Sequence, residues 1–195
     1  PGAPLLLSFL HAISQITQID PTIQPEYLRL RAVIEMAQNQ MDAAESDLKK
    51  ALTLDPGNVN ITLSYANLLW RTNRKDQAFQ VYNDGLKIDP SNHAALTALG
   101  YLSRDMANPQ AAEQYFLKVQ SLYPKDYVSY LALGDLYTSQ REFDKAQSNY
   151  EKAHRLAPNN PLVVSGGINS ALEAHKLPVA GTWVRRAEAN PVIEQ

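Results

Sequence analysis

A spacing of 34 residues recurs along this chain and constrains its fold more than any other feature. At this step, prolines occur at Pro56, Pro90, Pro124 and Pro158. At the same step, alanines occur at Ala44, Ala78, Ala112, Ala146 and Ala180. Self-similarity at a fixed period of about 20–50 residues is typical of solenoids, in which each unit packs only on its neighbours. The sequence therefore predicts a stack of short, similar units.

Each 34-residue unit contains two stretches with helical periodicity. In residues 59–92, the apolar residues Leu63, Ala66 and Leu69 are three residues apart, which places them on one helix face. A polar break follows, and a second apolar stretch of helical spacing runs up to Pro90. Proline disfavours helical backbone angles in the residue before it, so it ends the second helix. The chain is therefore predicted to be all-α, with helices of about 13 residues, or roughly 20 Å.

Small residues recur where the two helices of a unit are expected to approach closely. On the first helices these residues are Ala32, Ala66, Gly100 and Gly134. On the second helices the 34-spaced alanines hold the matching position, and a large side chain follows four residues later. In chain order, these large residues are Leu48, Tyr82, Phe116, Tyr150 and Val184. We expect them to fill space against the next unit, because one helix pair cannot bury its apolar face alone.

Residues 127–160 resemble the tetratricopeptide repeat. The positions that carry this resemblance are Tyr130, Leu133, Gly134, Tyr137, Ala146, Tyr150, Ala153 and Pro158. Residues 93–126 keep the pattern at Leu96, Leu99, Gly100, Ala112, Phe116 and Pro124. In the first helix of the first copy, Arg31 and Glu35 depart from it. The resemblance implies an all-α, right-handed superhelical solenoid of about five helix–turn–helix repeats.

The 34-residue step divides the chain into five predicted repeats within one solenoid that spans residues 1–195. The boundaries of the repeats are 25–58, 59–92, 93–126, 127–160 and 161–191. Residues 4–19 are predicted to form a further N-terminal helix, in the place of a truncated upstream repeat. Because the chain begins at Pro1 and stops abruptly at Gln195, we expect it to be a segment of a longer protein.

Composition and motifs argue against catalysis, cofactor binding and nucleic-acid binding. The 18 basic and 20 acidic side chains give a formal net charge of −2, without the basic excess of a nucleic-acid binder. The chain has no cysteine, so thiolate nucleophiles, disulfides and Cys-ligated zinc are excluded. Its four histidines lack metal-ligand spacing, and no nucleophile elbow or phosphate-binding loop occurs. We therefore predict a non-enzymatic protein without cofactor or metal.

A peptide-binding groove is predicted on the inward face of the first helices. Positions 2, 5, 9 and 12 of each first helix share one helix face, since they recur at three and four residues. The predicted site residues are Arg29, Asn60, Leu63, Asn67, Trp70, Tyr101, Arg104, Asp135 and Asn169, with Met36 and Thr138 beside them. The resemblance implies that Asn67 and Asn169 hold the backbone of a ligand, and an amide can both donate and accept. Trp70, Tyr101 and Arg104 are of types enriched at binding hot spots, and packing between repeats is the alternative role for Trp70.

The sequence does not fit the carboxylate clamp by which some tetratricopeptide proteins bind the C-termini of chaperones. That clamp needs basic and asparagine side chains at fixed positions of three successive first helices. Starting from the first copy, only Arg29 fits, and starting from the second copy, only Asn67 fits. We therefore exclude a carboxylate-clamp cochaperone.

The leading functional hypothesis is a protein–protein interaction scaffold that binds an extended or helical segment of a partner in the groove. One alternative is a structural spacer, or an assembly segment of a larger protein such as a bacterial exported one, that self-associates through its terminal repeats. Another is a regulatory appendage of an enzyme outside this sequence. No apolar run approaches the roughly 20 residues of a membrane span, so we expect a soluble protein of the cytoplasm or periplasm, without membrane insertion.

Overall fold

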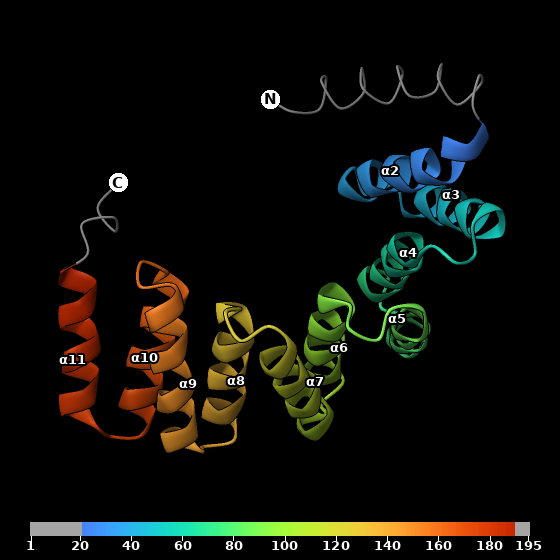
Figure 1. Ribbon diagram of the computed structural model, residues 1–195. Helices are drawn as coiled ribbons and strands as arrows, with labels where there is room; N and C mark the ends of the chain where they lie inside the picture. The colour runs from blue at the N-terminus through green and yellow to red at the C-terminus, as the bar shows by residue number, and fades with distance from the viewer. Residues whose placement is uncertain (1–20, 190–195) are drawn as a thin grey trace. The chain divides into compact units, whose positions relative to one another are not determined.

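The computed structural model describes residues 21–189, and that part of the chain is built from α-helices with no β-strand (Figure 1). A short 3-10 helix, η1 (Pro21–Ile23), precedes them. The ten described α-helices are α2 (Gln24–Ala37), α3 (Met41–Leu54), α4 (Val59–Arg71), α5 (Lys75–Ile88), α6 (His93–Asp105), α7 (Pro109–Leu122), α8 (Tyr127–Ser139), α9 (Phe143–Leu156), α10 (Pro161–Glu173) and α11 (Leu177–Glu188). The all-α prediction is therefore confirmed. The helix predicted at residues 4–19, and residues 190–191 of the last repeat, lie outside the described residues.

The helices follow one another at the 34-residue step of the sequence. Four first helices of successive pairs begin at Val59, His93, Tyr127 and Pro161. The second helices begin at Met41, Lys75, Pro109, Phe143 and Leu177. The same residue type is therefore placed at the same point of each pair, which is why packing positions recur along the chain.

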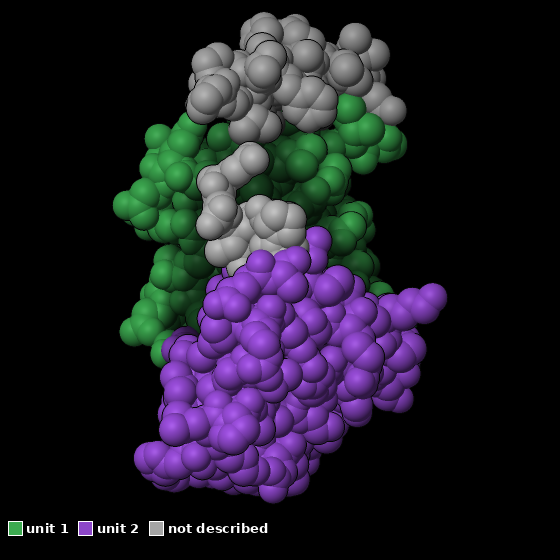
Figure 2. Space-filling model, turned by 90° about the vertical axis from the view of Figure 1, so that its left-hand side faces the viewer, with its two compact units in different colours: residues 1–95 green, residues 96–195 purple. Residues whose placement is uncertain are grey.

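Two compact units divide the chain, at residues 1–95 and 96–195 (Figure 2). We call them unit 1 and unit 2. In unit 1, α4 packs against α2, α3 and α5. In unit 2, α8 packs against α7, α9 and α10, and α10 also packs against α9 and α11. In each unit, first helices of neighbouring pairs therefore touch directly, α2 with α4 and α8 with α10, and form one layer.

The turn inside each helix pair has the same backbone geometry in all five pairs. One residue adopts a left-handed conformation with φ between 56° and 64°, and these residues are Asn39, Asn73, Ala107, Arg141 and His175. The amide of the next residue donates to the carbonyl five residues earlier, as from Asn108 to Ser103 at 2.9 Å. This is the Schellman motif that ends many helices. The donating residue is also the N-cap of the second helix, so only the left-handed residue separates the cap of one helix from the cap of the next.

The turn between pairs is stabilised by a polar side chain at the start of the next first helix. The capping residues are 34 apart, at Asn58, Asn92, Asp126 and Asn160. Each side chain accepts from a backbone amide in the first helical turn, as Asn92 Oδ1 does from Ala95 at 3.0 Å. Such a cap contributes about 1 kcal/mol. The preceding proline bounds the second helix as predicted, since α3 ends at Leu54, two residues before Pro56.

Small residues let the two helices of a pair approach closely. All five 34-spaced alanines are buried, with exposed fractions of 0–5%. A Cβ added at Gly100 would lie 2.5 Å from Phe116 Cε1, and one added at Gly134 would lie 2.7 Å from Tyr150 Cε1. The expectation that these large residues pack on the next unit is therefore incomplete, because each ring also covers the glycine of its own pair.

The last helix departs from the predicted packing pattern. Val184, expected in a packing position, is 40% exposed, whereas Trp183 beside it is fully buried. The indole lies against Gly167 of α10, where there is no room for a Cβ, and its Nε1 donates to Gln147 Oε1 at 2.8 Å. Gln147 in turn donates to the Gly167 carbonyl at 3.0 Å. The prediction for Val184 is therefore wrong, because the flat indole fills the space over glycine and moves the packing position by one residue.

The residues of the first copy that depart from the repeat pattern form an ionic cluster between α2 and α3. Arg31 donates through Nε and Nη2 to both carboxylate oxygens of Asp47, which is 7% exposed. The Tyr27 ring centroid lies 5.3 Å from the guanidinium carbon. Glu35 Oε1 lies 3.7 Å from Arg31 Nε, and burial, reinforced by the charge of Asp47, raises the pKa of Glu35. Helices α2 and α3 are thus held together partly by charge.

Candidate functional site

A hollow of about 300 Å³ opens on the first-helix layer of unit 2, between α8 and α10. Its lining residues are Asp135, Thr138, Ser139, Tyr150, Gly166, Asn169 and Glu173. Asp135 and Asn169 are 34 residues apart, at equivalent positions of neighbouring first helices. The structure therefore brings together two of the predicted site residues, with Thr138 next to them.

The Tyr150 side chain reaches this hollow from α9, through a gap left by two glycines. A Cβ at Gly134 of α8 would lie 2.7 Å from the ring, and a Cβ at Gly166 of α10 would lie 2.5 Å from it. The hydroxyl donates to Asp135 Oδ1 at 2.8 Å and lies 3.3 Å from Thr138 Oγ1. Burial raises the pKa of Tyr150, so the hydroxyl keeps its proton and remains a donor. The ring forms the floor of the hollow and its hydroxyl fixes the Asp135 carboxylate.

Polar groups of the hollow remain open to a ligand. The side-chain amide of Asn169 is exposed and makes no hydrogen bond within residues 21–189. Burial raises the pKa of Asp135, although the Tyr150 hydrogen bond and the charge of Arg104 act in the opposite direction. Arg104 lies on α6, with its guanidinium carbon 5.1 Å from the centroid of the Tyr101 ring. The predicted residues of unit 2 thus present an amide, a carboxylate, a guanidinium and an aromatic ring.

Tyr101 is held by the core rather than free to move. Its ring packs edge-on against Phe116, with centroids 5.1 Å apart, and burial raises the pKa of Tyr101. An edge-on pair of this kind contributes about 0.5–1.5 kcal/mol beyond its buried area. Tyr101 therefore offers a ring of fixed orientation beside Arg104.

In unit 1, the predicted residues lie on α2 and α4. Asn60 and Asn67 are exposed on α4, and Trp70 is half-buried near its end. Met36, predicted to lie beside the groove, is 3% exposed and packs in the core cluster of unit 1. That prediction is wrong, because the helix face assumed for the groove turns into the core at the end of α2.

Two further predicted residues of unit 1 are engaged in contacts within the unit. The Leu63 side chain lies over Gly85 of α5, where a Cβ would approach its Cδ2 to 2.9 Å. Arg29 donates to both carboxylate oxygens of Glu26 on the same helix, at 2.8 and 2.6 Å. Both side chains are half-buried, so a ligand would meet them in a constrained position.

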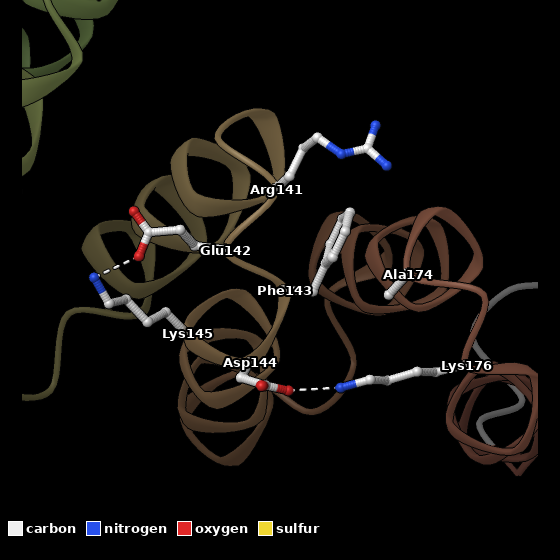
Figure 3. A pocket seen from close by; sticks show the side chains of 7 residues that line it. All are labelled: Arg141, Glu142, Phe143, Asp144, Lys145, Ala174 and Lys176. Carbon is white, nitrogen blue, oxygen red and sulfur yellow. Dashed lines mark hydrogen bonds and ion pairs between the residues drawn. The ribbon is translucent and has the colours of Figure 1, made fainter.

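A second hollow of about 330 Å³ lies near the turns that precede α9 and α11 (Figure 3). Its lining residues are Arg141, Glu142, Phe143, Asp144, Lys145, Ala174 and Lys176. Both of its carboxylates are paired, Glu142 with Lys145 at 2.5 Å and Asp144 with Lys176 at 2.6 Å. None of the predicted site residues lines it. Exposed ion pairs are screened by solvent and stabilise little, so this hollow is a charged surface feature rather than a formed site.

The described residues offer no metal centre and no membrane span. Among them, no three His, Cys, Asp or Glu side chains are placed to hold a metal ion. No helix in residues 21–189 has the length and hydropathy that crossing a bilayer requires.

Sequence reasoning missed four residues that line the hollow between α8 and α10, namely Ser139, Tyr150, Gly166 and Glu173. Tyr150 was assigned to packing alone, and Glu173 was not singled out. Glu173 follows Asn169 by four residues, so both lie on one face of α10, and this spacing was visible in the sequence. Gly134 and Gly166 were also visible, but the path that they open for Tyr150 depends on how closely the helices pack.

Helix pairs of this length, repeated every 34 residues and packed through alanine and glycine, define a stack of tetratricopeptide-type repeats. A family model described as cytochrome c-type biogenesis protein H TPR domain matches residues 29–130, more than half of the chain. A second model, described as tetratricopeptide repeat, matches residues 128–160. The chain therefore belongs to the tetratricopeptide-repeat family.

Relatives with established names match most of this chain but only part of their own length. The type IV pilus assembly protein PilF of Pseudomonas aeruginosa is 26% identical over 136 residues, covering 69% of this chain and 54% of PilF. The anaphase-promoting complex subunit CDC16 of Saccharomyces cerevisiae is 26% identical over 150 residues, covering 75% of this chain and 18% of CDC16. The human protein O-mannosyl-transferase TMTC1 is 31% identical over 130 residues, covering 67% and 14%. The chain thus spans about half of PilF and less than a fifth of the other two.

Solved structures share the fold at low sequence identity. BtubC from P. vanneervenii has a TM-score of 0.79 at 20% identity, covering 95% of this chain and 88% of that chain. Pseudomonas aeruginosa PilF has a TM-score of 0.74 at 21% identity, covering 97% and 90%. MamA has a TM-score of 0.73 at 20% identity, covering 85% and 91%. These likenesses concern the fold alone.

Proposed function

We propose that the chain is a non-enzymatic scaffold that binds a segment of a partner protein in the hollow between α8 and α10. One observation carries this proposal: the hollow gathers Asp135 and Asn169 from equivalent positions of adjacent first helices, with the Asn169 amide open. An amide can donate to and accept from a peptide backbone at once. One repeat earlier, Tyr101 and Arg104 add residue types that are frequent at binding hot spots.

The names of the relatives support this class of function. PilF is named for pilus assembly and CDC16 as a subunit of a complex, so both names describe participants in protein assemblies. The enzymatic name in the comparison is that of TMTC1, and this chain matches 14% of that protein. The names of PilF and CDC16 thus support a binding role for the repeats.

The test is selection of peptide ligands followed by a variant comparison. The 195-residue chain would be panned against a library of random peptides, and the affinity of a selected peptide measured by fluorescence anisotropy. Asn169→Ala should weaken binding about tenfold, since it removes up to two hydrogen bonds of about 0.5–1.5 kcal/mol each. The control is Glu142→Gln with Asp144→Asn, which alters the second hollow and should leave the affinity unchanged.

Two results would contradict the proposal. One is a panning experiment that selects no peptide. The other is a selected peptide whose affinity survives Asn169→Ala and falls in the control variant, because that pattern would place binding at the second hollow.

As a second candidate, we propose a structural spacer that self-associates through its last helix. The observation in its favour is that Leu177 and Val184 of α11 are 68% and 40% exposed. They are seven residues apart, so they lie on one helix face. Light scattering at increasing protein concentration should then show a dimer that Val184→Lys dissociates. A monomer at every concentration would contradict this candidate.

A further inference from the structure

The hollow between α8 and α10 carries unbalanced negative charge. Its lining contains the carboxylates of Asp135 and Glu173 and no basic side chain. Asp135 accepts the Tyr150 hydroxyl at Oδ1, and neither carboxylate has an ion pair within the described residues. In the second hollow, by contrast, each carboxylate is paired with a lysine. The same unit thus neutralises one pair of carboxylates internally and leaves the other pair open.

The shape of the hollow fits one extended side chain. Its volume of about 300 Å³ lies at the lower end of the roughly 300–1,000 Å³ found for small-ligand pockets. Tyr150 closes the bottom of the hollow, where its ring is packed between Gly134 and Gly166 and is only 2% exposed. Asp135 stands on α8 and Glu173 on α10, so the two carboxylates flank the hollow from opposite helices.

We propose that this hollow takes the cationic side chain of an arginine or lysine in the partner segment, with its charge between Asp135 and Glu173. Asn169 then holds the adjacent backbone of the partner segment. This inference rests on the proposed function, since it names the residue type that the scaffold reads.

The choice of a cation follows from charge complementarity. An acidic or apolar side chain would cover two carboxylates and leave both without a cationic partner, which is costly. Burial raises the pKa of Asp135, and a cation beside this carboxylate would favour its charged form. Arg104 acts on Asp135 from α6, but it is not part of the lining and contacts Tyr101 instead. Arginine fits better than lysine, because its planar guanidinium carries five N–H donors and can face two carboxylates at once.

The experiment is an NMR titration of the 195-residue chain with N-acetyl-arginine methylamide. Its matched probe is N-acetyl-citrulline methylamide, which has nearly the same shape and no charge. The arginine probe should shift the backbone amide signals of Asp135, Asn169 and Glu173 saturably, and should bind at least about fivefold more tightly than the citrulline probe. Asp135→Asn with Glu173→Gln should abolish that preference.

The variant Glu142→Gln with Asp144→Asn is the matched control, because it removes the same amount of charge from the same unit. It should keep the arginine preference, whereas loss of the preference there would show that only long-range charge matters and would overturn the inference. Equal binding of both probes, or arginine shifts at the second hollow, would also overturn it. Selected peptides that depend on Asn169 but lack a preferred basic residue would overturn this inference and leave the proposed function standing. An arginine-specific response at the hollow without any selected peptide would count against the proposed function alone.

Discussion

The substitution Gly134→Ala tests whether the Tyr150 ring is wedged between α8 and α10. The new Cβ would lie 2.7 Å from the ring, whereas non-bonded carbon atoms prefer about 3.5–4.0 Å, so the ring would have to move about 1 Å. It cannot retreat freely, because the Gly166 backbone of α10 lies so close to its other side that even a Cβ there would come within 2.5 Å of the ring. Overpacking of this kind costs about 1–3 kcal/mol, and alanine returns about 1 kcal/mol through its helix propensity. With both sides of the ring blocked, we expect Gly134→Ala to lower the unfolding free energy of unit 2 by about 1–2 kcal/mol.

Urea unfolding followed by Trp183 fluorescence measures this loss. The chain has two tryptophans, Trp70 in unit 1 and Trp183 in unit 2, so a Trp70→Phe background makes the signal report unit 2. The control is Gly181→Ala on α11, where the nearest heavy atom is Arg185 Nη1 at 3.7 Å. This ordinary contact leaves only the propensity gain, so the control should stabilise unit 2 by about 1 kcal/mol.

A double-mutant cycle identifies the ring as the cause. Adding Tyr150→Leu to Gly134→Ala should recover part of the loss, because leucine leaves room for the new methyl group. If Gly134→Ala is as stable as the parent, or gains stability as the control does, the ring is not wedged and the reasoning fails. In that case the helix spacing would be set elsewhere.

Three further predictions concern a turn in unit 2 and two ion pairs in unit 1. Ala107→Gly should raise the urea midpoint of unit 2 by the equivalent of about 1 kcal/mol, since Ala107 has a φ of 56° and left-handed angles cost a residue with a Cβ roughly 1–2 kcal/mol. Arg31→Met should lower the unfolding free energy of unit 1 by about 2–3 kcal/mol, because it strips the buried Asp47 carboxylate of its partner, and adding Asp47→Leu should recover most of the loss. Hydrogen bonds, that from Arg74 above all, lower the pKa of Glu45 from 4.5 to about 2. The contribution of these hydrogen bonds to the unfolding free energy of unit 1 is therefore complete above pH 4.5 and is lost as the pH falls through about 2. Glu45→Gln should flatten the pH dependence of this free energy, measured by unfolding followed through Trp70 fluorescence.

Each of these predictions has a control and a contrary result. Ala98 has an ordinary helical conformation on α6, so Ala98→Gly should lower the unfolding free energy of unit 2 by about 1 kcal/mol. A lower unfolding free energy in both Ala98→Gly and Ala107→Gly would refute the conformational argument. Arg29→Met removes an ion pair with Glu26 along one helix and should lower the unfolding free energy of unit 1 by only about 0.5 kcal/mol. A loss no larger than this in Arg31→Met would contradict the argument from the buried Asp47 carboxylate. An unchanged acid dependence in Glu45→Gln would exclude that carboxylate as the cause.

The 34-residue step predicts the helix pairs, because it applies both to the prolines that end helices and to the small residues where helices approach closely. The left-handed turns carry no such signal in three of the five pairs. Ala107, Arg141 and His175 are not the glycine or asparagine that marks such a turn, and the packing of the pair imposes the conformation. The capping residues are different, since Asn58 and its equivalents are also spaced by 34 and were available to sequence reasoning.

Side-chain partners from different helices set the limit of prediction in both units. Arg31 and Asp47 are 16 residues apart, so no spacing within one helix relates them, and Arg31 looked only like a departure from the pattern. In the hollow, the 34-residue spacing predicts that Asp135 and Asn169 share a face. It does not predict the entry of Tyr150 from α9, because that entry depends on the distance between two helix backbones.

The turn inside each helix pair also limits how such an array can change its length. The residue that closes the Schellman motif is already the cap of the next helix, so the turn contains no spare residue. An insertion there would disrupt the end of one helix and the start of the next at once. The turn between pairs is looser, and a Cβ at Gly57 would meet no heavy atom within 4 Å. We therefore expect the turns between helix pairs to accept inserted residues, and the turns inside each helix pair not to accept them.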